Sequence, residues 1–237
     1  LFCLALWELA ARVGWIDPFI GSSPSRLWAA ILRLYQAGEL WGHIGVTLLE
    51  TVVGFIAGTL LGTLAAVFLW WSATLNRILD PYLVILNALP KIALGPILIV
   101  WFGAGMKSII VMGLLISLVV TIMSVLAGFN AITDEKQLLM RTLGASKMQI
   151  LTMVVLPASL PTIMNALKIS VGMSWVGVIV GEYLVSKAGL GYLIVYGGQV
   201  FNLDLVMASI VILCLLAAIM YYGVAYLERR ICQRVGA

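Results

Sequence analysis

The chain has 237 residues, of which 63% are hydrophobic and only 10% are charged, and its formal net charge is +4. A soluble domain carries about 25% charged residues, so this composition excludes a water-soluble globular protein. The uncharged runs 51–76, 108–133 and 205–227 are each long enough to cross a hydrocarbon core as a helix, which takes about 20 residues. The short alternating segments typical of a transmembrane barrel are absent from the sequence. The predicted fold is an all-α integral membrane protein.

We expect about six transmembrane helices in a single domain covering residues 1–237. Residues 1–12 are predicted to be the latter part of a longer, truncated first helix, and a loop rich in Gly, Pro and Ser follows at 14–25. An amphipathic helix over 25–40 is expected to lie on the membrane surface, with a plain loop as the alternative. The remaining spans are predicted at 42–72, 78–103 (interrupted by Pro90 and Pro96), 107–130, 160–184 and 204–228.

The connection before the fifth span, residues 131–157, is predicted to hold two short helices. The first should end at Gly144, because glycine readily adopts the left-handed conformation that closes a helix. Ser146 and Gln149 have the spacing of a capping box, so a second helix should start there and end before Pro157. A short amphipathic element fixed at both ends is suited to docking into a groove on a partner protein. On spacing alone, an interfacial helix that only anchors the loop is an equal alternative.

This connection resembles the cytoplasmic loop of permease subunits from binding-protein-dependent ABC importers. The signature of that loop is Glu-Ala-Ala followed by a Gly and, further on, a Pro; Gly144 and Pro157 occupy the last two positions. The flanking sequences "RTLGASKMQI" and "VVLPASLP" also match, although residues 138–140 are Leu-Leu-Met instead of Glu-Ala-Ala. "GEYLVSKAGLGYLIVYG" (181–197) and "NALPKIALGPILIVWFGAGMKS" (87–108) are similar to the nitrate, sulfonate, taurine and bicarbonate branch of the family.

The resemblance implies a five-helix permease core with a cytoplasmic coupling helix, working as a homodimer in a bacterial inner membrane. The implied partners are a second copy of the chain, a cytoplasmic ABC ATPase dimer, an external substrate-binding protein and membrane lipid, with no nucleic acid. The implied substrate is a small anion, such as a sulfonate, nitrate or bicarbonate, or a small nitrogen compound. The residues that the resemblance assigns to ATPase coupling are Leu138, Leu139, Met140, Leu143, Gly144, Ala145, Ser146, Gln149, Ile150 and Pro157.

The sequence contains no GxxxxGK[ST] phosphate loop, so we expect this chain to be a transport subunit and not an enzyme. ATP and Mg²⁺ would be used by the partner ATPase. No cofactor, metal site or catalytic residue is expected in the chain itself, because its three cysteines and single histidine form no ligand-spacing motif. The alternatives are a secondary transporter driven by an ion gradient, which commonly has internal repeats, and a membrane-embedded enzyme.

Within the predicted spans, Gly54, Gly58 and Gly62 are spaced four apart and should form a close helix-packing stripe. Glu50 shares this face, and its side chain is expected to reach the nearby membrane–water interface. Lys91 lies between two prolines, where it would favour an anionic substrate or contact lipid phosphate. The candidate pathway residues are Asn87, Pro90, Lys91, Trp175 and Glu182. The Lys and Arg residues in short loops, with a cluster at 229–234, favour a cytoplasmic C-terminus.

Overall fold

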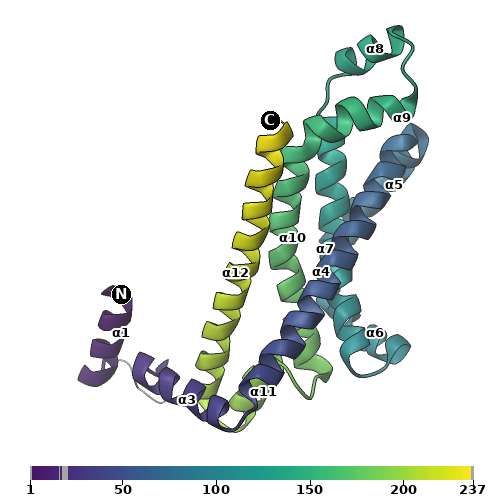
Figure 1. Cartoon of the computed structure of the whole chain (residues 1–237). Coiled ribbons are helices and arrows are strands. Elements are labelled where there is room, and N and C mark those ends of the chain that lie inside the picture. The colour runs from purple at the N-terminus through teal and green to yellow at the C-terminus, as the bar shows by residue number, and fades with distance from the viewer. Residues whose placement is uncertain (1, 16, 18–20, 236–237) are drawn as a thin grey trace.

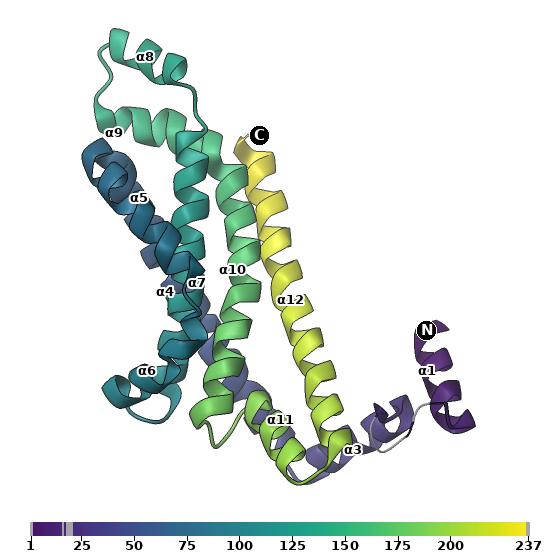
Figure 2. The same ribbon diagram turned by 180° about the vertical axis from the view of Figure 1, so that it is seen from behind.

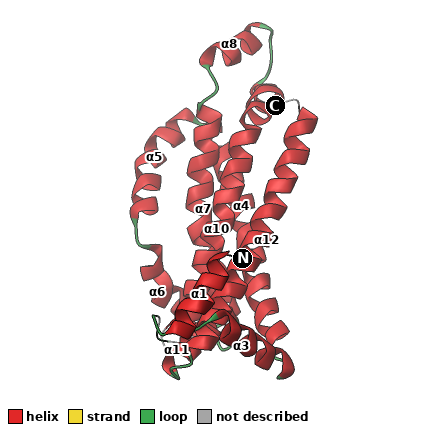
Figure 3. Ribbon diagram, turned by 90° about the vertical axis from the view of Figure 1, so that its left-hand side faces the viewer, coloured by secondary structure: helices red, strands yellow, loops and turns green. Residues whose placement is uncertain are grey.

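The computed structural model describes residues 2–15, 17 and 21–235, and all regular secondary structure in these ranges is helical (Figure 3). Parts of the predicted 14–25 loop therefore lie outside the described residues. The helices are α1 (Phe2–Val13), α3 (Pro24–Gln36), α4 (Leu40–Trp71), α5 (Ala73–Ala88), the 3₁₀ turn η1 (Lys91–Leu94), α6 (Gly95–Phe102), α7 (Met106–Asn130), α8 (Asp134–Thr142), α9 (Lys147–Ile150), the π-helical turn η2 (Leu151–Val155), α10 (Leu156–Val185), α11 (Leu190–Gln199) and α12 (Leu203–Val235).

Four helical segments among the described residues are long and apolar enough to cross a membrane: α4, α7, the continuous run Lys147–Val185 and Leu203–Gln233 within α12. The predicted 78–103 span is different, because α5 and the η1–α6 pair meet at an angle of 86°. This segment is either one broken span or a re-entrant loop. If it counts as one span, the described residues contain 5 candidate membrane spans. The bend follows Pro90, whose ring fixes the backbone and removes a donor, while Pro96 stands in the first turn of α6.

Helix α7 forms the centre of the bundle and packs along both α4 and α10. Small residues permit this contact: a Cβ added at Gly177 of α10 would lie 2.6 Å from the Cα of Gly113 in α7. A buried hydrogen bond of 2.7 Å between the hydroxyls of Thr121 and Ser170 joins the same two helices. Close backbone approach and interhelical hydrogen bonds are the main means by which helices associate in lipid.

The amphipathic helix predicted at 25–40 is present as α3, but its apolar face packs on protein instead of lying on lipid alone. Leu27 and Ala30 are buried against Ala208 of α12. At the start of both helices, the Arg26 guanidinium forms an ion pair of 2.9 Å with Asp204. These contacts, which arise between distant parts of the chain, fix α3 across the end of α12.

The bundle has two distinct ends (Figures 1 and 2). Helices α8 and α9 project at one end, and the C-terminal end of α12 lies near them. Helices α3 and α11 lie at the opposite end, and α5 and α6 flank the bundle on the side away from α12. The predicted coupling loop and the C-terminus therefore face the same side of the membrane.

The prediction that the second short helix ends before Pro157 is wrong. The chain stays helical from Lys147 to Val185, with Pro157 in the first turn of α10 and Pro161 inside it. The five residues of η2 form a π-helical turn immediately before α10. Proline is tolerated in the first turn of a helix, and a π-turn changes the hydrogen-bond register so that the chain can bend without breaking.

Candidate functional site

The predicted coupling segment is a helix, a glycine turn and a second helix. Helix α8 ends at Thr142, and Gly144 follows with φ of +81°. The Gly144 and Ala145 amides donate to the carbonyls of Arg141 and Met140, at 2.9 and 3.0 Å, which closes the helix end. The Ser146–Gln149 capping box is present: the Ser146 hydroxyl accepts from the Gln149 amide at 3.3 Å, and the Gln149 side chain accepts from the Ser146 amide at 2.7 Å.

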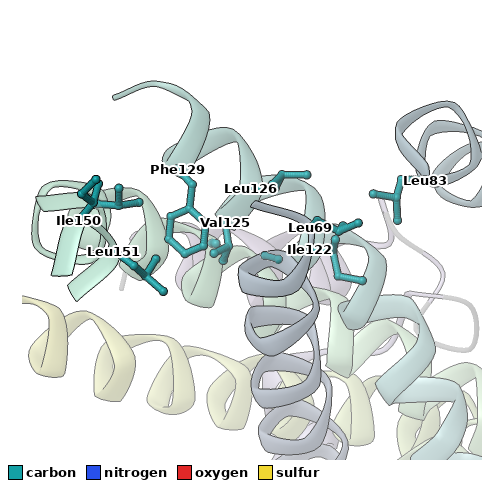
Figure 4. Close-up of a cluster of buried hydrophobic side chains, with 11 residues drawn as sticks. Leu69, Leu83, Ile122, Val125, Leu126, Phe129, Ile150 and Leu151 are labelled. Atoms are coloured by element: carbon teal, nitrogen blue, oxygen red, sulfur yellow. The ribbon is translucent and has the colours of Figure 1, made fainter. Parts of the chain in front are cut away.

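The inner side of this segment is built into the bundle. Ile150, which is 2% exposed, packs with Leu151 in a buried cluster with Val125 and Phe129 of α7 and Leu69 of α4 (Figure 4). The cluster therefore joins the second short helix to two membrane helices. Met140 and Ala145 pack against its edge. Burial of such side chains stabilises the contact by about 1.5–3 kcal/mol each, so the second helix is a fixed part of the bundle and not a free loop.

The outer side of the segment is apolar and exposed. Leu138, Leu139 and Leu143 are 60%, 62% and 74% exposed, on a projection beyond the end of the bundle (Figure 1). We call these three residues the outer leucine face. Exposed clusters of large apolar side chains outside the lipid zone mark binding sites for other proteins. Leu138 and Leu139 stand where the family signature has Glu and Ala.

Lys147 fixes the segment to the end of α4, a contact that the sequence did not predict. Its ammonium group donates a hydrogen bond to the Trp71 carbonyl. The same group lies 5.7 Å and 5.4 Å from the ring centroids of Trp70 and Trp71. Trp70 in turn packs edge-on against Phe129 of α7, with ring centroids 6.4 Å apart. A displacement of the coupling segment would therefore reach α4 and α7 directly.

The five candidate pathway residues lie in two separate places. Asn87, Pro90 and Lys91 gather at the bend between α5 and α6, where the Lys91 ammonium donates to the Asn87 carbonyl at 3.0 Å. Trp175 and Glu182 are buried on α10. Trp175 packs with Val171 and Val224, and its indole nitrogen has no hydrogen-bond partner among the described residues.

The expectation that the Glu50 side chain reaches the membrane–water interface is wrong. Its side chain is 1% exposed and contacts Glu182, which is also 1% exposed. The sequence could not reveal this pairing, because the two residues are on different helices. Lys168, which is too far along α10 to pair with Glu182, forms an ion pair of 2.9 Å with Glu228 of α12.

The glycine stripe of α4 packs against α7. A Cβ added at Gly58 would lie 2.1 Å from the Ser117 hydroxyl oxygen, and one at Gly62 would lie 2.8 Å from the Thr121 Cβ. At Gly54 the nearest atom is the Ile110 carbonyl oxygen, at 3.3 Å. Gly58 and Gly62 thus leave no room for a side chain and Gly54 leaves little, as the spacing predicted.

The fold and its projecting segment correspond to a known family. Residues 58–233 match the family model of the binding-protein-dependent transport system inner membrane component. The chain belongs to this family. It is 34% identical over 228 residues to a "Probable ABC transporter permease protein" of Haemophilus influenzae, covering 96% of this chain and 92% of that protein. It is 28% identical to the taurine transport system permease protein of Escherichia coli K12, covering 96% and 85% of the two chains.

A solved structure of the MetNI methionine ABC transporter in an inward-facing conformation has the same fold, with a TM-score of 0.71 and 23% sequence identity over 84% of this chain and 97% of that chain. This chain is the membrane-spanning permease subunit of an ABC importer for a small solute, and it is a multi-pass inner-membrane protein. The permease subunit is a transport protein and not an enzyme.

Proposed function

We propose that residues 131–157 are the segment through which a separate cytoplasmic ATPase drives this permease. The outer leucine face is the observation that carries the proposal, because it is an exposed apolar surface on a segment that projects from the bundle. The second short helix, packed through Ile150 into the bundle core, would pass the partner's movement to α7 and α4. ATP and Mg²⁺ bind to the partner, two copies of which face two copies of this chain, and this chain itself binds no cofactor.

The missing Glu-Ala-Ala fits a contact of a different kind. A glutamate at Leu138 would offer a charged contact, whereas this chain offers Leu138, Leu139 and Leu143 to an apolar groove. The groove on the ATPase that receives this permease should accordingly be lined by apolar side chains. Met140, which packs against the core cluster, sets the orientation of the leucines instead of contacting the partner.

The substrate of the proposed importer is a small anion that an external binding protein delivers. Lys91 supports this class, since it puts a cation at a bend in the backbone beside Asn87. The Escherichia coli relative is named for taurine, a zwitterion whose sulfonate group is negatively charged. The coupling segment and the C-terminus lie in the cytoplasm, and α3 and α11 lie on the side from which the binding protein delivers its ligand.

The test is affinity purification of the tagged full-length protein from native membranes, followed by mass spectrometry. Gly144→Asp places a side chain at φ of +81° in the coupling turn, where no neighbouring atom lies within 4 Å. Gly38→Asp is the matched control, because Gly38 has φ of +75° and equal free space in the turn after α3 at the opposite end of the bundle.

An ATPase that co-purifies with the wild type and with Gly38→Asp, but not with Gly144→Asp, supports the proposal. Retention of the ATPase by Gly144→Asp would contradict the docking role of this turn. If no ATPase accompanies the wild type under conditions that keep membrane complexes intact, the proposal that residues 131–157 dock a separate ATPase is contradicted.

A further inference from the structure

The first turn of α11 is held by side chains from two other helices. The first backbone N–H groups of a helix have no partner within the helix and must be satisfied from outside. The Gly189 amide donates to Nδ1 of His43 at 2.9 Å, and the Leu190 amide donates to the Thr47 hydroxyl at 2.8 Å. The Gly191 amide donates to the Glu182 carboxylate at 2.5 Å. Helix α11 is thus fastened to α4 and α10 at its N-terminus.

Glu182 receives several donors at this junction. Its Oε1 accepts from the Thr47 hydroxyl at 2.6 Å, and its Oε2 accepts from the Gly191 amide. Glycines make room for the carboxyl group: a Cβ added at Gly189 would lie 2.5 Å from it, and one at Gly191 would lie 2.7 Å from Oε2. A group that accepts from amides at a helix N-terminus is stabilised as an anion. These donors favour Glu182 over Glu50 as the ionised member of this site.

Glu50 is a second carboxyl group in the same buried place. It is 1% exposed, it contacts Glu182, and its Oε2 has no hydrogen-bond partner among the described residues. A carboxylate has only acceptor oxygens, so two carboxylates cannot hydrogen-bond to each other. Two like charges in contact and away from water repel strongly, and one of them takes up a proton instead.

The described residues place no ion-pair partner beside either carboxyl group. None of the ion pairs formed by described residues includes Glu50 or Glu182. His43 uses Nδ1 as an acceptor and stacks on Tyr192 of α11, with ring centroids 6.0 Å apart. On the α7 side, Gly181 packs against the apolar Ile109.

We propose that Glu50 and Glu182 form a proton-binding site, in which protonated Glu50 donates to ionised Glu182 and the pair fastens α11 to α4 and α10. The bound ligand is one proton, held on Glu50. The pair then carries a single negative charge, which is the charge that the N-terminus of α11 requires. Glu50 is a positioning residue, because it acts on α11 through Glu182. This site lies at the end of the bundle opposite to the coupling segment, and the proposal does not depend on the ATPase.

Infrared spectroscopy of the purified full-length protein in lipid tests the proton directly. A protonated carboxylic acid has a C=O stretching band that is separate from the bands of carboxylates. We expect the wild-type band to disappear in Glu50→Gln and to persist in Glu39→Gln, an exposed glutamate at the start of α4. If Glu50→Gln removes no such band from the spectrum, the proposal is overturned, because Glu50 then does not hold the proton.

Amide hydrogen exchange over residues 187–196 tests the fastening of α11. Glu50→Gln keeps a donor next to Glu182, so exchange should stay at the wild-type rate. Glu182→Gln removes the charge and turns one acceptor into a donor facing the Gly191 amide, and exchange there should rise about tenfold. Unchanged exchange in Glu182→Gln would contradict the fastening role. Should Glu182→Gln fail to insert, the Glu50→Gln spectrum still decides whether the pair holds a proton.

Discussion

The Lys147 ammonium group donates to the Trp71 carbonyl and thereby ties the coupling segment to the end of α4. The two residues are 76 positions apart in the chain. The rings of Trp70 and Trp71 surround the same cation, within 5.7 Å and 5.4 Å of it. This contact gives the permease a second mechanical link besides the apolar cluster around Ile150, and both links reach the last turns of α4.

Lys147→Met should weaken this link and reduce uptake. Methionine keeps the length of the side chain but loses the charge, and an exposed cation–π contact is worth about 0.5–1 kcal/mol. We therefore expect the transport rate to fall by about two- to fivefold, while the amount of protein inserted in the membrane stays unchanged. The measurement is substrate uptake by membrane vesicles at equal permease content. Lys136→Met, which changes an exposed lysine of α8, is the control, and an equal loss in both variants would count against the link.

Gly58→Val should disturb the packing of α4 on α7. The added Cβ would lie 2.1 Å from the Ser117 hydroxyl oxygen and 3.1 Å from the Leu114 carbonyl, so the helices must move apart. Overpacking of this kind costs about 1–3 kcal/mol. Thermal unfolding of the detergent-purified protein should occur at a lower temperature. Gly45→Val, at a site in α4 with no atom within 4 Å, should change this temperature little.

Lys91→Glu should selectively impair uptake of an anionic substrate. The substitution places a negative charge beside Asn87 at the bend, and like-charge juxtaposition costs several kcal/mol. We expect uptake of the transported anion to fall by about tenfold or more. Lys107→Glu makes the same change at an exposed residue in the first turn of α7 and serves as control. Equal transport of that anion by the wild type and Lys91→Glu would remove Lys91 from the pathway.

The Lys168–Glu228 ion pair should show coupling between α10 and α12. The side chains are 20% and 24% exposed, so the pair is screened less than a fully exposed one. Lys168→Glu should destabilise the protein, and Glu228→Lys added to it should restore about 1 kcal/mol of stability. A double-mutant cycle of unfolding midpoints measures this coupling energy. A double variant no more stable than the sum of the single changes would show that the pair does not join the helices.

Local patterns predicted much of the coupling segment. The capping box at Ser146 and the turn at Gly144 depend on residues within a few positions, and both are present. The prediction that the helix ends before Pro157 is wrong. Pro157 stands in the first turn of α10, after a π-helical turn, where proline does not break the helix.

The sequence by itself determined that this is a helical membrane protein, where its main spans lie and which loop resembles a coupling segment. The helical class and the spans follow from composition and short-range spacing, which one chain segment contains in full, whereas the role of the loop is what the resemblance to a known family implies. Only the tertiary structure decided that Glu50 meets Glu182, that Lys147 meets Trp71, and that α5 and α6 bend apart by 86°. Such contacts join different helices, and their partners are selected by how the helices pack, a choice that hydropathy and local propensity do not encode.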